Sequence, residues 1–252
     1  MRGEECHISL GGTARSPQDI ELLHTLGLEF AEIPVTDPEE ITRLIQAFKG
    51  LQDALGMRYL CHGPREGDPN DIESLEKNYF PRIKAIIKVM NYLKMSLLTL
   101  HLWLDQRFVN REAIHFKIGL LSRILELAAS EQVTVCIENL SERASDLEPV
   151  FREMAMLGMT LDLGHAQLLS DVNTSYSFME KYPERIKHVH MHDNWGGSSY
   201  HDDIHLPPGK GSVDFRRIFS GLRKIGYCRT VTLELKPAEI KGCLGFVKSV
   251  IY

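Results

Sequence analysis

Eight short apolar segments recur along the whole 252-residue chain, and helical or polar stretches separate them. They span residues 6–10, 28–33, 58–62, 96–102, 133–139, 159–164, 187–192 and 230–235. Eight strands alternating with helices in about 250 residues are typical of a parallel (β/α)8 TIM barrel of the α/β class. An open, doubly wound sheet is the alternative, but no GxGxxG motif follows the first segment. No linker divides the chain, so we expect residues 1–252 to form a single barrel domain.

Capping residues between the apolar segments predict where helices begin and end. A Ser-Pro pair at 16–17 begins one predicted helix, which Gly27 ends; an Asp-Pro pair at 37–38 begins the next, which ends at Gly56. Further helices are expected over about 110–130, over 146–157 with Gly158 as the stop, and over 214–225.

Net charge, the length of apolar runs and the cysteine content limit the classes of protein to which this chain can belong. The net charge of −5 gives no overall basic field for nucleic acid, although a local basic groove stays compatible with it. No run of about 18 apolar residues predicts a membrane span, and the N-terminus lacks an apolar signal region. Five scattered cysteines without a CxxC pair favour reduced, mostly buried thiols. We therefore expect a cytoplasmic protein, and the sequence permits a homo-oligomer.

The last six strand segments each carry a histidine or an acidic residue at or near the carboxyl end. These residues are His62, His101, Glu138, Asp162 followed by His165, His190 followed by His192, and Glu234. Carboxyl ends of barrel strands meet at one mouth, where the catalytic groups of this fold lie. Any one of these residues alone would be interpreted as structural or solvated. Six strands with the same feature favour a shared site.

Clustered carboxylates in a barrel mouth repel one another unless a cation lies among them. Mixed histidine and carboxylate ligands suit zinc or manganese better than calcium, with cobalt or magnesium as further candidates. In the segment "HVHMHD", alternate positions share one face of a strand. We expect His190 to be a metal ligand, His192 to contact substrate, and His188 to be structural.

The long segment after the seventh strand, "DNWGGSSYHDDIHLPPGKGSVDF", contains an Asp-x-His pair, Asp203 and His205. Both side chains of such a pair can bind one cation. A Gly-Lys-Gly turn at 209–211 would let backbone amides and Lys210 approach an anionic substrate, although a plain turn explains it equally well.

The motifs "CIEN", "LDLGH", "HMHD", "DIHLPPGKG" and "LEL" resemble the xylose isomerase-like barrel superfamily, and the resemblance covers nearly the whole chain. The superfamily contains sugar isomerases and epimerases as well as endonuclease IV-type abasic-site nucleases. The sugar branch implies one metal bound by Glu138, Asp162, His190 and Glu234. In that branch the two glutamates also act as acid and base, and His165 contacts substrate.

The nuclease branch implies nine ligands for three zinc ions. All nine residue types occur here in order: His62, His101, Glu138, Asp162, His165, His190, Asp203, His205 and Glu234. Two segments depart from that branch. "HGPREGDPN" replaces the Ser-Tyr-Leu segment that enters DNA, and "HDNW" lacks the lysine of the Asn-Asp-Ser-Lys run. These differences argue against DNA recognition and leave the metal ligands unchanged.

Two enzyme hypotheses follow, and a metal- or sugar-binding barrel without catalysis is the third. The first is a metal-dependent isomerase or epimerase of a small sugar, sugar phosphate or hydroxy-ketone, which reacts through an enediolate. Glu138 and Glu234 would move the proton, and the substrate contacts would come from His62, His101, His165, His192 and Lys210. The second is an endonuclease IV-like, zinc-dependent phosphodiesterase that acts on abasic DNA.

Overall fold

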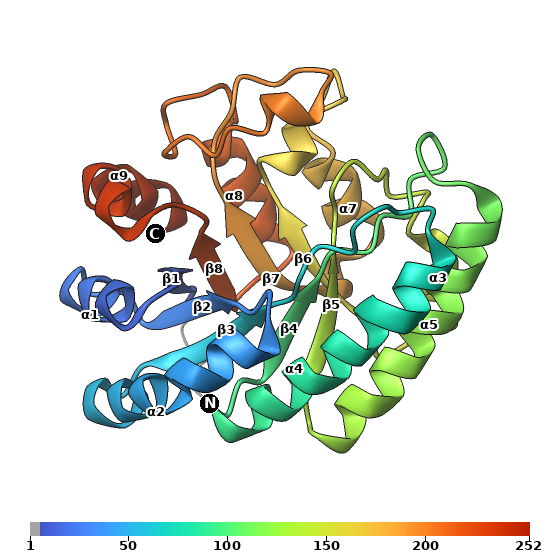
Figure 1. Cartoon of the computed structure of the whole chain (residues 1–252). Coiled ribbons are helices and arrows are strands. Elements are labelled where there is room, and N and C mark those ends of the chain that lie inside the picture. Colours follow the sequence, from blue (N-terminus) through green and yellow to red (C-terminus); the bar gives the residue numbers. More distant parts are fainter. Residues whose placement is uncertain (1–5) are drawn as a thin grey trace, which may run out of the picture.

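The computed structural model describes residues 6–252, and its eight parallel strands close into a barrel in chain order, with β1 pairing β8 (Figure 1). The strands are β1 (Ser9–Thr13), β2 (Phe30–Pro34), β3 (Arg58–His62), β4 (Leu97–Leu100), β5 (Thr134–Glu138), β6 (Gly158–Asp162), β7 (Ile186–Met191) and β8 (Thr230–Leu233). The predicted (β/α)8 fold is therefore confirmed.

Helices surround the strands on the outside of the barrel (Figure 1). The α-helices are α1 (Pro17–Thr25), α2 (Pro38–Leu55), α3 (Ile72–Ser74), α4 (Phe80–Tyr92), α5 (Arg111–Ser130), α6 (Glu148–Glu153), α7 (Ser175–Lys181), α8 (Phe215–Lys224) and α9 (Pro237–Ile251). Short π or 3-10 segments are η1 (Leu75–Tyr79), η2 (His165–Gln167), η3 (Pro183–Arg185) and η4 (Tyr200–Asp202).

Several helix ends follow the capping signals of the sequence. The Asp37 side chain accepts the backbone N–H of Glu39 at the start of α2, and Gly56 ends this helix with a left-handed φ of 67°. The expected helix over 146–157 is shorter than predicted, since α6 spans Glu148–Glu153. Gly158 begins β6 instead of stopping a helix, because a Cβ there would lie 2.7 Å from Lys187 and 2.8 Å from Cys136.

Strand β1 lies three residues beyond its predicted position. It spans Ser9–Thr13, so it includes Gly11 and Gly12, which sequence patterns place after a strand. A Cβ on Gly11 would lie 2.4 Å from the Phe30 ring, and one on Gly12 would lie 2.8 Å from Ile240 and Leu23. These glycines are in the strand because its neighbours pack directly against its backbone.

The expectation of five reduced thiols is wrong for two cysteines. Cys6 and Cys228 form a disulfide with their Cα atoms 5.2 Å apart, whereas Cys61, Cys136 and Cys243 are free and buried. Closure of the barrel pairs β1 with β8, which brings together two cysteines that lie 222 residues apart in the sequence. Spacing along the chain carries no signal for such a pair.

The apolar core fills the layer between strands and helices, and the barrel interior itself contains polar groups. Thr99 and Thr160 hydrogen-bond across it at 2.8 Å, and His188 and His190 are fully buried there. The segment between β7 and α8, orange in Figure 1, lies at the carboxyl ends of the strands. Within residues 6–252, no helix combines the length and apolarity needed to cross a membrane.

Candidate active site

Four predicted ligands lie together at the ends of four adjacent strands. Glu138 ends β5, Asp162 ends β6, His190 lies in β7, and Glu234 directly follows β8. The Nδ1 atom of His190 lies 3.2 Å from Glu234 Oε1, 3.3 Å from Glu138 Oε1 and 3.8 Å from Asp162 Oδ2. Each side chain offers a ligand atom within 4.8 Å of the others. We call these four residues the central group.

Three atoms of the central group are buried and have no hydrogen-bond partner among residues 6–252. They are Glu138 Oε1, Asp162 Oδ2 and His190 Nδ1. A buried polar atom without a partner costs about 1–3 kcal/mol, so three around one point require an explanation. All three are good ligands for a divalent cation, and the donor set of one imidazole and three carboxylates fits zinc or manganese.

His62 and His101 flank the central group on the side of β3 and β4. Nε2 of His101 lies 2.9 Å from Glu138 Oε2, and Nε2 of His62 lies 3.3 Å from the same oxygen. His62 also lies 3.9 Å from Glu234. Together with Glu138 they form a second group of atoms close enough to hold an ion.

His165, His192, Asp203 and His205 form a third group on the other side of the mouth. Oδ2 of Asp203 lies 3.2 Å from His165 Nε2 and 3.3 Å from His205 Nε2. The His192 and His205 rings stack with their centroids 3.8 Å apart. The structure thus brings the extended set of predicted residues into the same mouth, and the Asp-x-His pair does not lie on a distant surface loop.

Asp193 holds the β7–α8 segment in place. Its carboxylate is fully buried and accepts the backbone N–H groups of Gly209, Gly211 and Val213 at 2.8–3.1 Å. The amides of the Gly-Lys-Gly turn therefore bind this carboxylate, which corresponds to the plain-turn alternative. The Lys210 side chain is exposed on that turn, and its contact with substrate stays a prediction.

Histidines, rather than lysines or arginines, set the electrostatics of the mouth. Burial alone would raise the pKa of Glu138, but His101 and His190 hold that pKa well below its usual range. Burial lowers the pKa of His205, yet its hydrogen bond to Asp203 and the nearby Glu234 raise it to about 9. The buried carboxylates Glu138 and Asp203 are therefore stabilised by neighbouring imidazoles.

Glu32 is a buried member of the network that sequence analysis missed. It lies in β2, and both of its carboxylate oxygens lie within 3.1 Å of His190 Nε2. The sequence carried a signal, because Glu32 is one of two glutamates, with Glu29, in the otherwise apolar segment 28–33. Glu32 is the penultimate residue of that segment, the position that Glu138 and Glu234 hold in theirs, so the strand-end pattern extends to the second segment.

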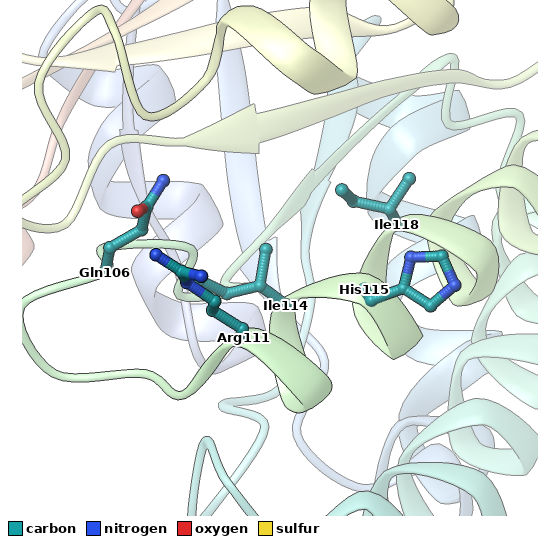
Figure 2. Close-up of a pocket in the computed structure, with 5 residues that line it drawn as sticks. All are labelled: Gln106, Arg111, Ile114, His115 and Ile118. Atoms are coloured by element: carbon teal, nitrogen blue, oxygen red, sulfur yellow. The ribbon is translucent and has the colours of Figure 1, made fainter.

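A cavity of about 710 Å³ opens among the loops that follow β4 to β7, on the mouth face of the barrel. Arg107, Ser141, Arg143, Leu168 and Ser198 are among the residues that line it. A smaller cavity of about 330 Å³ lies at the start of α5, lined by Gln106, Arg111, Ile114, His115 and Ile118 (Figure 2). These five residues include no candidate site residue.

The sequence matches the model of a family described as xylose isomerase-like TIM barrel over residues 20–247. Two relatives are uncharacterized proteins of Methanocaldococcus jannaschii. One is 25% identical over 71% of this chain and 71% of its own length, and the other is 28% identical over 50% of this chain and 44% of its own length. The chain thus spans less than half of the latter.

Solved structures share the fold over nearly their whole length. A xylose isomerase domain protein from Planctomyces limnophilus has a TM-score of 0.81 at 18% identity, with 98% of each chain covered. A D-tagatose 3-epimerase-like protein has a TM-score of 0.79 at 22% identity, covering 97% of this chain and 98% of that one. The IolI protein with a bound zinc atom has a TM-score of 0.79 at 16% identity with the same coverage.

Proposed function

The chain belongs to the xylose isomerase-like TIM barrel family, and we propose that it is a divalent-metal-dependent isomerase or epimerase of a small sugar, sugar phosphate or hydroxy-ketone. The central group carries this proposal. Two glutamates, Glu138 and Glu234, lie beside one imidazole nitrogen at 3.3 and 3.2 Å, and a third carboxylate completes the donor set. Proteins of similar fold described as sugar epimerases support the substrate class.

Glu138 and Glu234 differ in their access to solvent, so the two glutamates can play different roles in proton transfer. The Glu138 side chain is fully buried and fixed by His101, whereas the Glu234 side chain is 14% exposed. One would remove the proton from the carbon next to the substrate carbonyl, and the other would return a proton to the opposite face or to the neighbouring carbon. A bound cation would supply Lewis-acid polarisation of the substrate oxygens.

The surrounding histidines would orient the substrate. His62, His101, His165 and His192 lie around the central group, so their ring nitrogens can contact hydroxyl groups. We assign His165 a catalytic contact with substrate, because its ring lies 3.2 Å from Glu138 Oε1. Zinc or manganese is the proposed ion, and the zinc atom in the IolI structure is consistent with that choice.

A zinc-dependent phosphodiesterase is the second candidate, and one observation favours it. The flanking groups add six histidine and aspartate side chains to the central group, which is enough for more than one ion. Clustered ions suit phosphoester hydrolysis. The segment after β3 argues against DNA as substrate. Its Glu66 is buried in an ion pair with Lys117 at 2.8 Å, and is therefore not available to contact a lesion.

Solvent proton exchange tests the proposal. Protein loaded with Mn²⁺ or Co²⁺ is incubated in D₂O with a panel of ketoses, ketose phosphates and hydroxy-pyruvate-like compounds, and deuterium incorporation next to the carbonyl is followed by NMR. We expect exchange with at least one compound, and its loss in Glu138→Gln and Glu234→Gln. Glu126→Gln, an exposed change on α5, is the control. Rapid nicking of an abasic DNA duplex that is lost in Glu138→Gln, without deuterium exchange in any of the sugar compounds, would favour the phosphodiesterase hypothesis instead.

A further inference from the structure

Glu32 contacts the histidine of the central group from the side opposite the other ligands. Its Oε1 and Oε2 atoms lie 3.1 and 3.0 Å from His190 Nε2. The Nδ1 atom of the same ring faces Glu138, Asp162 and Glu234. One imidazole therefore joins the carboxylate of β2 to the mouth of the barrel.

The environment of Glu32 requires hydrogen-bond donors. Its side chain is 1% exposed, and its polar contacts are imidazoles: His190, and His188 with Nε2 at 3.2 Å. A buried carboxylate without donors is strongly unfavourable. Glu32 thus accepts an Nε2–H from His190, and that assignment leaves Nδ1 free of a proton in a neutral ring.

His188 and two threonines hold Glu32 in turn. Thr230 Oγ1 lies 2.7 Å from His188 Nδ1, and Thr232 Oγ1 lies 3.0 Å from His188 Nε2. All of these side chains come from β2, β7 and β8, so regular strands fix them. The polar interior of this part of the barrel is a chain of contacts that ends at His190.

We propose that Glu32 is a positioning residue for the metal site: by accepting the Nε2–H of His190, it orients the ring and directs the lone pair of Nδ1 toward Glu138, Asp162 and Glu234. The inference rests on the metal site of the proposed function. Outer-shell carboxylates that orient a histidine ligand typically change metal affinity 10–100-fold when they are mutated. His188 is a second positioning residue, which acts through Glu32.

The test compares wild type, Glu32→Gln and the control Thr99→Val. The control removes a different interior hydrogen bond, the one between Thr99 and Thr160, which does not involve His190. Zinc affinity is measured by competition with a chromophoric chelator, and the visible spectrum of the cobalt-loaded protein reports ligand geometry. We expect a 10–100-fold weaker affinity and a shifted cobalt spectrum for Glu32→Gln, with neither change in Thr99→Val.

A measurement on the wild type keeps the proposal testable if Glu32→Gln fails to fold. Ring ¹⁵N NMR of zinc-loaded protein should show His190 with hydrogen on Nε2 and metal on Nδ1. The proposal is overturned if the proton lies on Nδ1, or if Glu32→Gln binds zinc within threefold of wild type with an unchanged cobalt spectrum. Loss of one whole equivalent of zinc at unchanged affinity also overturns it, because Glu32 would then be a ligand itself. If wild type binds no divalent ion, the proposed function fails as well.

Discussion

At the mouth of the barrel, the carboxylates of the candidate site pair with histidines rather than with lysines or arginines, and this pairing matters for function. Among the described residues, the ion pairs of Glu138, Asp162, Asp203 and Glu234 are with imidazoles. A lysine or arginine would neutralise these carboxylates permanently. A histidine can release its proton near neutral pH and become a ligand, so protons and a cation can compete for the same atoms.

The Asp193 carboxylate holds the segment between β7 and α8, so we expect its replacement to destabilise the protein. Asp193→Asn would place an amide NH₂ against the backbone N–H groups of Gly209, Gly211 or Val213. Because hydrogen bonds to a charged group contribute about 1.5–3 kcal/mol each, we expect a loss of roughly 2–4 kcal/mol in the free energy of unfolding. Urea denaturation measures this loss, and hydrogen exchange should show faster opening of 203–213.

Asp171→Asn, an exposed change in the loop after β6, is the matched control and should stay within about 0.5 kcal/mol of wild type. Unchanged stability and unchanged exchange in Asp193→Asn would show that the segment is held by other contacts.

At the scale of elements, close backbone packing sets where β1 lies. Gly11→Ala would place a methyl group 2.4 Å from the Phe30 ring, so we expect it to destabilise the protein by about 1–3 kcal/mol. Gly50→Ala lies within α2, and beyond the adjoining helix backbone no atom of residues 6–252 lies within 4 Å of its Cβ position, so this change should stabilise the protein by roughly 0.5–1 kcal/mol. The thermal unfolding temperatures of the two variants, each compared with wild type, measure these opposite effects. Equal shifts for both would mean that β1 tolerates a side chain.

Gly11 shows the limit of sequence patterns for predicting where strands and helices lie. Apolar periodicity and caps predicted the eight strands and helices such as α2, because these signals are local. The position of β1 depended on Phe30 in the neighbouring strand, and the Cys6–Cys228 disulfide depended on closure between the first and last strands. Residue types at strand ends placed His62 and Glu234 in the mouth. The place of Glu32 near the end of its segment was a local signal, but its contacts with His188 and His190 depend on closure of the barrel and cannot be predicted from spacing.

For the whole molecule, the histidine network predicts how stability depends on pH without metal. The structure raises the pKa values of His62, His165, His190 and His205, the last to about 9, whereas burial lowers those of His101 and His188. Histidines whose pKa is raised in the folded state contribute stability that is fully present below the unfolded pKa of about 6.5. This stability is lost as pH rises through their folded pKa values.

Metal-free protein should therefore become less stable between about pH 6.5 and 9, as measured by the midpoint of urea denaturation. With saturating zinc, the slope should be smaller or reversed, because metal binding displaces protons from the imidazoles. Identical slopes with and without zinc would indicate that these histidines are not ligands.

The central claim is that Glu138, Asp162, His190 and Glu234 bind one divalent cation at the mouth. Equilibrium dialysis with zinc, followed by elemental analysis of wild type, Glu234→Gln and the exposed control Glu126→Gln, tests it most directly. Glu234→Gln keeps the shape of the side chain and removes the charge that lies 3.2 Å from His190 Nδ1. We predict at least one zinc per chain in wild type and control, and a sharp fall in Glu234→Gln. Full zinc occupancy in Glu234→Gln would contradict the assignment of this site.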